Sequence, residues 1–131
     1  MKPEFSVTQH LYVDKLFLNG LLEDLKLIVQ ASGNDAKIML VSAESRTINE
    51  QYNAYKGTLD RIVDALQGAG CNQAVLSICV RAYRYIPEIG FPGEMLKKLA
   101  QIGASIDVDI INMIESSDTV EEDGPKESGC N

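Results

Sequence analysis

The chain has 131 residues, is 45% hydrophobic and carries a formal net charge of −7. This length is typical of one domain, and this apolar content can form a core without help from a metal or from disulfide bonds. Because the chain lacks a basic footprint, it is not expected to bind nucleic acid. No apolar run reaches the roughly 18 residues of a membrane span, so no membrane association is expected.

The negative charge is concentrated at the C-terminus. Residues 115–131 contain six acidic side chains and one lysine, a net charge of −5, whereas residues 1–114 carry only −2. The C-terminal segment also has almost no large apolar side chains to bury. We therefore predict a single α/β domain over residues 1–114, followed by a disordered acidic tail over residues 115–131.

The sequence favours a cytoplasmic protein. The first 13 residues lack the long apolar region and the small-residue cleavage site of a secretory signal. The three cysteines, Cys71, Cys79 and Cys130, show no paired Cys-x-x-Cys spacing. A reducing compartment is the default for such a chain.

Several segments have a clear period. Apolar residues at helical spacing predict one helix after Thr47, which forms a capping box with Glu50, and another that begins near Pro92 and ends at Gly103. The first of these helices contains Gly57, which is less favourable there than alanine. Alternating or short apolar runs predict strands over residues 4–13, 37–43, 74–83 and 105–111.

The segment after the first strand allows two interpretations. Residues 18–29 place six apolar side chains at helical spacing, and Gly33 is a suitable residue to end such a helix. However, Asn19-Gly20 is also a strong turn signal, which would make residues 20–31 an arm of a β-hairpin. We favour the helix because it accounts for all six apolar positions.

These elements alternate as βαβαβαβ, which predicts an α/β fold. Alternation of this kind is typical of a single small sheet, here of about four strands packed with about three helices. Helical connections favour parallel neighbouring strands. If the first helix is instead a hairpin arm, the sheet becomes mixed or antiparallel and the class becomes α+β.

Two aspartates are candidate metal ligands. Asp107 and Asp109 are two residues apart on a predicted strand, so their side chains share one face and could hold a hard cation or divide acid and base roles. No third ligand is near them in sequence. We favour a solvated or edge-protecting strand face.

A second candidate site combines tyrosine and arginine, which dominate binding hot spots. Arg81, Tyr83, Arg84 and Tyr85 lie at the end of a predicted strand and form a candidate partner-binding cluster. Alternatively, Arg81 pairs with Asp107 or Asp109 on a neighbouring strand. The single histidine, His10, lies in the first strand without a supporting catalytic pattern.

The segment 91–111, which contains EMLKKLAQIGASIDVDII, resembles the closing motif of a widespread uncharacterised bacterial domain family. Members of that family end in a leucine-rich helix, a glycine-containing turn and a Leu-Asp-Ile-Asp strand, which Asp107 and Asp109 match. The resemblance covers about the C-terminal half, and the family's opening segment and tryptophan are absent. Some members are encoded beside polymorphic toxins as presumed immunity proteins, so the resemblance implies a protein-binding role.

Three functional hypotheses follow. The first is a small cytoplasmic module without a cofactor or catalytic activity, which binds a partner protein as an immunity or inhibitor protein. The second is a metal-binding domain or enzyme that uses Asp107 and Asp109. The third is a structural homodimer that pairs through edge strands and the apolar side chains of Ile111 and Met113.

Overall fold

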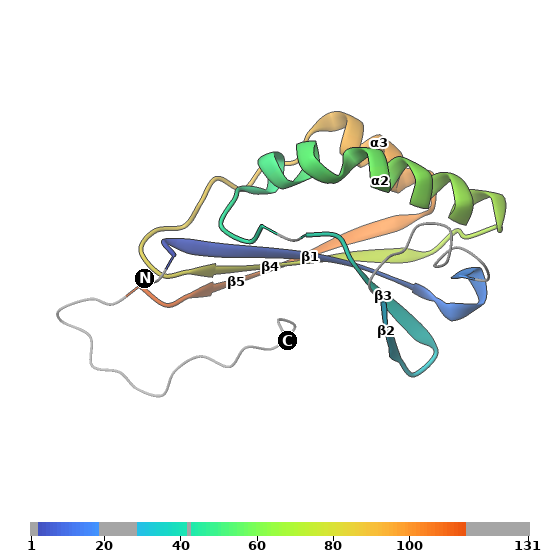
Figure 1. Ribbon diagram of the computed structural model, residues 1–131, viewed down its shortest axis with the longest axis horizontal. Coiled ribbons are helices and arrows are strands. Elements are labelled where there is room, and N and C mark those ends of the chain that lie inside the picture. Colours follow the sequence, from blue (N-terminus) through green and yellow to red (C-terminus); the bar gives the residue numbers. More distant parts are fainter. Residues whose placement is uncertain (1–2, 19–28, 42, 115–131) are drawn as a thin grey trace.

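The structure, a computed structural model, describes residues 3–18, 29–41 and 43–114. In this part of the chain, one sheet of five strands in the order β2-β3-β1-β4-β5 is packed with helices on one face (Figure 1). The strands are β1 (Phe5–Asp14), β2 (Val29–Ser32), β3 (Asp35–Met39), β4 (Ala74–Ala82) and β5 (Ala104–Asn112), and the helices are η1 (Lys15–Leu18), a 3-10 turn, α2 (Ile48–Gly68) and α3 (Gly93–Ala100).

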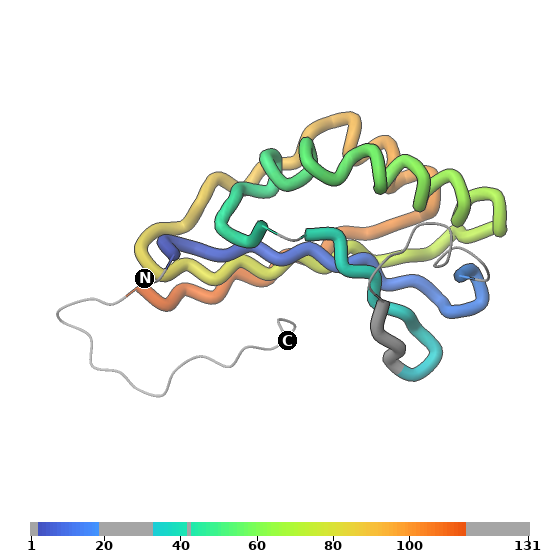
Figure 2. Tube along the Cα trace, viewed as in Figure 1, coloured from blue at the N-terminus to red at the C-terminus, as the bar shows by residue number. Residues whose placement is uncertain are grey.

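The sheet is mixed, with β1 at its centre. Strand β1 pairs antiparallel with both β3 and β4, so that Leu11 lies between Ile38 and Leu76. Only β4 and β5 run parallel, and they are connected through α3. The tube in Figure 2 shows that the start of β1 and the ends of β4 and β5 lie together at one end of the molecule.

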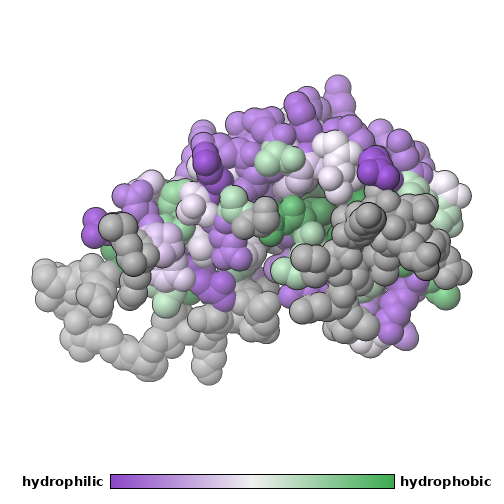
Figure 3. Space-filling model, viewed as in Figure 1, coloured by the Kyte–Doolittle hydropathy of each residue, from purple (hydrophilic) through white to green (hydrophobic). Residues whose placement is uncertain are grey.

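The core lies between the sheet and the helices. Helix α2 buries the side chains of Tyr52, Leu59 and Ile62, which are each at most 1% exposed. Burying a large apolar side chain contributes roughly 1.5–3 kcal/mol to the free energy of unfolding. These three residues belong to one cluster with Val7 of β1 and Ile78 of β4. In Figure 3, hydrophilic residues cover the outer side of the helices, and hydrophobic residues gather beneath them.

The structure confirms a single sheet packed with helices and corrects the βαβαβαβ order. The predicted helix that ends at Gly33 is wrong over residues 29–32, which form β2 and pair antiparallel with β3. Gly33 lies instead in the β2–β3 turn with φ of 64°. Residues 19–28 and the predicted acidic tail over residues 115–131 lie outside the described part. The class is therefore α+β, and the expectation of parallel neighbours holds only for β4 and β5.

The predicted capping box at the start of α2 is confirmed. The Thr47 hydroxyl accepts a hydrogen bond from the Glu50 N–H at 3.2 Å, and the Glu50 carboxylate accepts one from the Thr47 N–H at 2.9 Å. Two N–H groups that lack helical partners are thereby satisfied. Along the described residues, no helix is long and apolar enough to cross a membrane.

A buried polar network connects α2 to β1. The Gln9 side-chain N–H donates to Gln51 Oε1 at 2.9 Å, and the Tyr55 hydroxyl donates to Gln9 Oε1 at 2.6 Å. Gln51 Nε2 donates to the carbonyl groups of Val7 and Ala43 at 2.8 and 3.0 Å. Because a satisfied network inside a protein tolerates only one arrangement of its members, it aligns α2 with β1.

We expect Gln51→Leu to lower the free energy of unfolding by about 2–4 kcal/mol, because it leaves the buried Gln9 amide and the Val7 carbonyl without partners. Urea unfolding monitored by circular dichroism measures this change. Gln67→Leu, the same substitution at an exposed position of α2, is the control and should change stability by no more than about 0.5 kcal/mol. Equal effects of the two variants would contradict the proposed role of the network.

Substitution by alanine at two glycines should change the free energy of unfolding in opposite directions. Gly103 has φ of 63°, and an added Cβ would overlap the backbone carbonyl of Asn72, so Gly103→Ala should cost about 2 kcal/mol or more. Gly57 is inside α2 with open space around it, so Gly57→Ala should stabilise the protein by about 1 kcal/mol. Thermal and urea unfolding of both variants would test this pair, and a stable Gly103→Ala protein would contradict the described turn.

Candidate functional site

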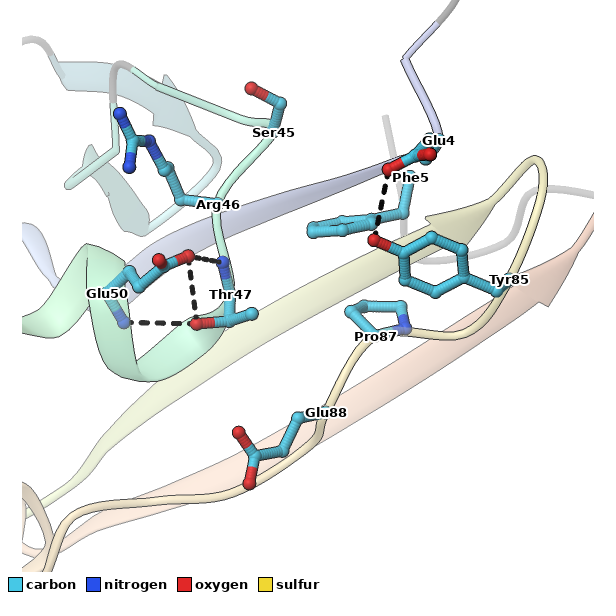
Figure 4. Close-up of a pocket in the computed structure, with 9 residues that line it drawn as sticks. All are labelled: Glu4, Phe5, Ser45, Arg46, Thr47, Glu50, Tyr85, Pro87 and Glu88. Atoms are coloured by element: carbon cyan, nitrogen blue, oxygen red, sulfur yellow. Dashed lines mark hydrogen bonds between the residues drawn. The ribbon is translucent and has the colours of Figure 1, made fainter.

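A pocket of about 470 Å³ lies where the start of β1, the N-terminus of α2 and the loop after β4 meet (Figure 4). Strand β1 contributes its first residue, Phe5, the capping box of α2 forms one wall, and the loop that leads to α3 forms the other. The residues that line the pocket are Glu4, Phe5, Ser45, Arg46, Thr47, Glu50, Tyr85, Pro87 and Glu88.

Tyr85 is an ordered and exposed aromatic side chain in this pocket. The residue is 46% exposed, and its ring packs edge-to-face against Phe5 with 5.6 Å between the ring centroids. Its hydroxyl donates a hydrogen bond to the Glu4 carboxylate at 3.1 Å (Figure 4). These two contacts restrain the ring while one of its sides remains available to a ligand.

The backbone of Glu4 positions the segment that carries Tyr85. Strand β4 ends at Ala82, and the chain then bends away from the sheet over residues 83–85. The Glu4 carbonyl accepts hydrogen bonds from the N–H groups of Tyr83 and Arg84 at 3.0 and 2.8 Å. The residue just before β1 therefore fixes both the backbone and the side chain of this segment.

The pocket has an excess of negative charge. Three carboxylates (Glu4, Glu50 and Glu88) and one guanidinium (Arg46) line it. The backbone N–H of Thr47 holds the pKa of Glu50 below its usual value, so this carboxylate is ionised at neutral pH. The pKa of Tyr85 is raised, mainly by the hydrogen bond to Glu4 and secondarily by desolvation. The phenol of Tyr85 is therefore protonated. Such a site suits a cationic side chain such as lysine or arginine.

The structure separates the candidate partner-binding cluster into two parts. Arg81 is on β4 in register with Ser6 and Ile111, on the sheet face opposite the helices. Tyr85 instead contacts Phe5, which belongs to the core beneath the helices. Arg84 is exposed and Tyr83 half-buried in the bend between these two positions. Only Tyr85 lines the pocket.

Asp107 and Asp109 share the sheet face of Arg81. In the β4–β5 register, Asp107 lies beside Ser77 and Asp109 beside Cys79. Asp107 is exposed and Asp109 half-buried. Within the described ranges, no three His, Cys, Asp or Glu side chains gather in a way that could hold a metal ion. The ion pair between Arg81 and one of these aspartates stays a prediction.

His10 lies on the same sheet face, in register with Ser77 of β4 and Met39 of β3. Partial burial, and secondarily the charge of Lys37, lower the pKa of His10 below its usual value. A histidine in this setting is neutral at pH 7. It has no neighbouring group in the sequence pattern that would indicate catalysis.

His10 should make stability depend on pH. Because its pKa is lower in the folded state, the unfolded state binds more protons below about pH 6.5. The contribution of neutral His10 to the free energy of unfolding is therefore fully present above about pH 6.5. It decreases as the pH falls toward the pKa of His10 in the folded state. We expect urea unfolding between pH 7.5 and 5.5 to show a smaller loss of stability in His10→Gln than in the unmodified protein. An identical pH dependence in both would contradict the burial of His10.

Sequence reasoning did not identify most of the pocket. Glu88 is far from Glu4 and Phe5 in the chain, and these residues belong to no recognisable motif. Glu50 was assigned only its capping role. The one usable signal was Tyr85, because tyrosine is one of the side chains that dominate binding hot spots.

In comparisons with known proteins, no family model, curated protein or solved structure is significantly similar to this chain. No residue role is therefore transferred from a relative. The assignment of the pocket is based on its geometry and its charge.

Proposed function

We propose that this protein is a small protein-binding module that engages a basic partner protein, as an immunity or inhibitor protein does. The observation that carries this proposal is the restrained, exposed ring of Tyr85, which is hydrogen-bonded to the Glu4 carboxylate in a pocket that Glu50 and Glu88 also line. Tyrosine is one of the residues that most often dominates binding energy at protein interfaces.

The restraint on Tyr85 favours binding. A side chain that is free in solution loses roughly 0.5–1.5 kcal/mol of entropy when an interface immobilises it. Contacts with Phe5 and Glu4 already hold this ring, so a partner would order it at a smaller cost. The ring then offers apolar area next to groups that accept hydrogen bonds.

Charge supports a basic partner. The pocket has three carboxylates against one guanidinium, and the whole chain carries a net charge of −7. Opposite charges on two proteins accelerate their association and disfavour partners with the wrong sign. The resemblance of residues 91–111 to a family with presumed immunity proteins supports the same class of function.

The test is affinity capture of the tagged protein from its native cell lysate, read by mass spectrometry. We expect one stoichiometric partner, and we expect Tyr85→Ala to weaken its binding by about 30-fold or more, as the loss of a hot spot does. Isothermal titration with the purified partner measures the affinity.

Two variants make this experiment specific. Leu96→Ala removes an apolar side chain of nearly the same exposure on α3, 44% against 46% for Tyr85, and should leave the affinity unchanged. Tyr85→Phe keeps the ring on Phe5 and removes only the hydroxyl that reaches Glu4, so its effect should be intermediate. Equal affinity of Tyr85→Ala and the unmodified protein would exclude this surface.

A further inference from the structure

Strand β5 forms one edge of the sheet, and its outer side has no partner strand among the residues that the structure describes. It is nine residues long, and it pairs with β4 over this entire length. An edge of this length offers a row of backbone N–H and C=O groups that can pair with another strand.

The side chains along β5 divide into an apolar row and an acidic row. Val108 and Ile110, on the helix side of the sheet, are 36% and 46% exposed although they are large and hydrophobic. Asp107 and Asp109 project from the opposite face. Beyond the strand, Met113 and Ile114 are also large and exposed, at 40% and 39%.

We propose that the β5 edge binds an extended segment of a partner protein in which apolar residues alternate with lysine or arginine. Such a strand places its apolar side chains beside Val108 and Ile110 and its cations beside Asp107 and Asp109. Main-chain hydrogen bonds provide affinity and the alternating side chains provide specificity. This inference rests on the proposed protein-binding function and names the chemistry of the partner.

A second copy of this chain fits the edge poorly. If two β5 strands paired antiparallel over their full length, Ala104 would lie opposite Asn112, and Asp107 would therefore lie opposite Asp109, twice. A shift of two residues places either Asp107 or Asp109 opposite itself. Like charges directly opposite each other destabilise strand pairing. The two aspartates thus disfavour self-pairing and favour a basic strand at the same edge.

The charge that follows β5 in the chain supports a basic occupant. Residues 115–131 carry a net charge of −5, and they continue directly from the exposed end of this edge at Ile114. Acidic residues attached there raise the local concentration of a cationic segment. A strand with acidic residues at the alternating positions would meet repulsion from both the aspartates and this segment.

The experiment uses synthetic peptides of about nine residues, the length of β5. In one set valine alternates with lysine, and in the other valine alternates with glutamate. Fluorescence anisotropy with the full-length protein measures their affinities, and nuclear magnetic resonance shows which backbone amides are perturbed. We expect the lysine peptides to bind at least about fivefold more tightly than the glutamate peptides and to perturb the amides of β5.

Charge reversal provides the matched control. Asp107→Lys should abolish or invert the preference for lysine peptides. Asp64→Lys makes the same change in net charge at an exposed position of α2 and should preserve most of the preference. If both variants respond alike, the peptides bind through general electrostatics, and the inference is wrong.

Other outcomes also decide the question. No binding of either peptide set, or perturbation of amides outside β5, overturns the inference. If sedimentation shows a dimer and nuclear magnetic resonance shows that the β5 amides form its interface, the edge binds a second copy and the inference is overturned. The pocket variant Tyr85→Ala should bind the lysine peptides normally. If the edge fails these tests while that variant still weakens capture of a partner, the proposed function stands without the edge.

Discussion

Hydrogen bonding to β1 is the constraint on which the rest of the structure depends. This strand pairs on both sides, with β3 and with β4, and its inward side chains are buried beneath α2. A shift of one residue would turn Val7 and Leu11 away from the core. The same strand holds α2 through Gln9 and the segment of Tyr85 through Glu4. The core and the pocket therefore share one support.

The two proposed binding surfaces have the same chemistry on different scaffolds. The pocket places the Tyr85 ring beside the Glu4 carboxylate, and the carboxylates of Glu50 and Glu88 also line it. The β5 edge places exposed aliphatic side chains on one face and two aspartates on the other. Both combine apolar area with negative charge, and the start of β1 lies together with the ends of β4 and β5 (Figure 2). One basic, partly extended partner could satisfy both.

Local signals in the sequence were reliable where neighbouring residues carry the interaction. The capping box of Thr47 and Glu50 spans three residues, and it formed as predicted. Gly103 was predicted to end a helix, and it has the positive φ that this position requires. The helical spacing after Thr47 and the alternation in β4 also correctly indicated which side chains are buried.

The predicted helix before Gly33 failed over residues 29–32 because four residues with one large apolar side chain are too few to distinguish the two periods, and pairing with β3 selects the strand. The direction of β1 relative to its neighbours was also not predictable. Its alternation is compatible with parallel or antiparallel neighbours, and the partners on β3 and β4 are distant in the chain. The pocket depends on these partners, since its carboxylates come from separate segments.

The sequence by itself thus determined the elements with strong periods, their caps and the residues that face the core, because those depend on residues within a few positions of one another. Only the tertiary structure decided the strand order, the position of β5 at an edge and the meeting of Glu4 with Tyr85. These features depend on hydrogen bonds and packing between segments far apart in the chain. Periodicity shows that such a segment needs a partner, but it does not show which one.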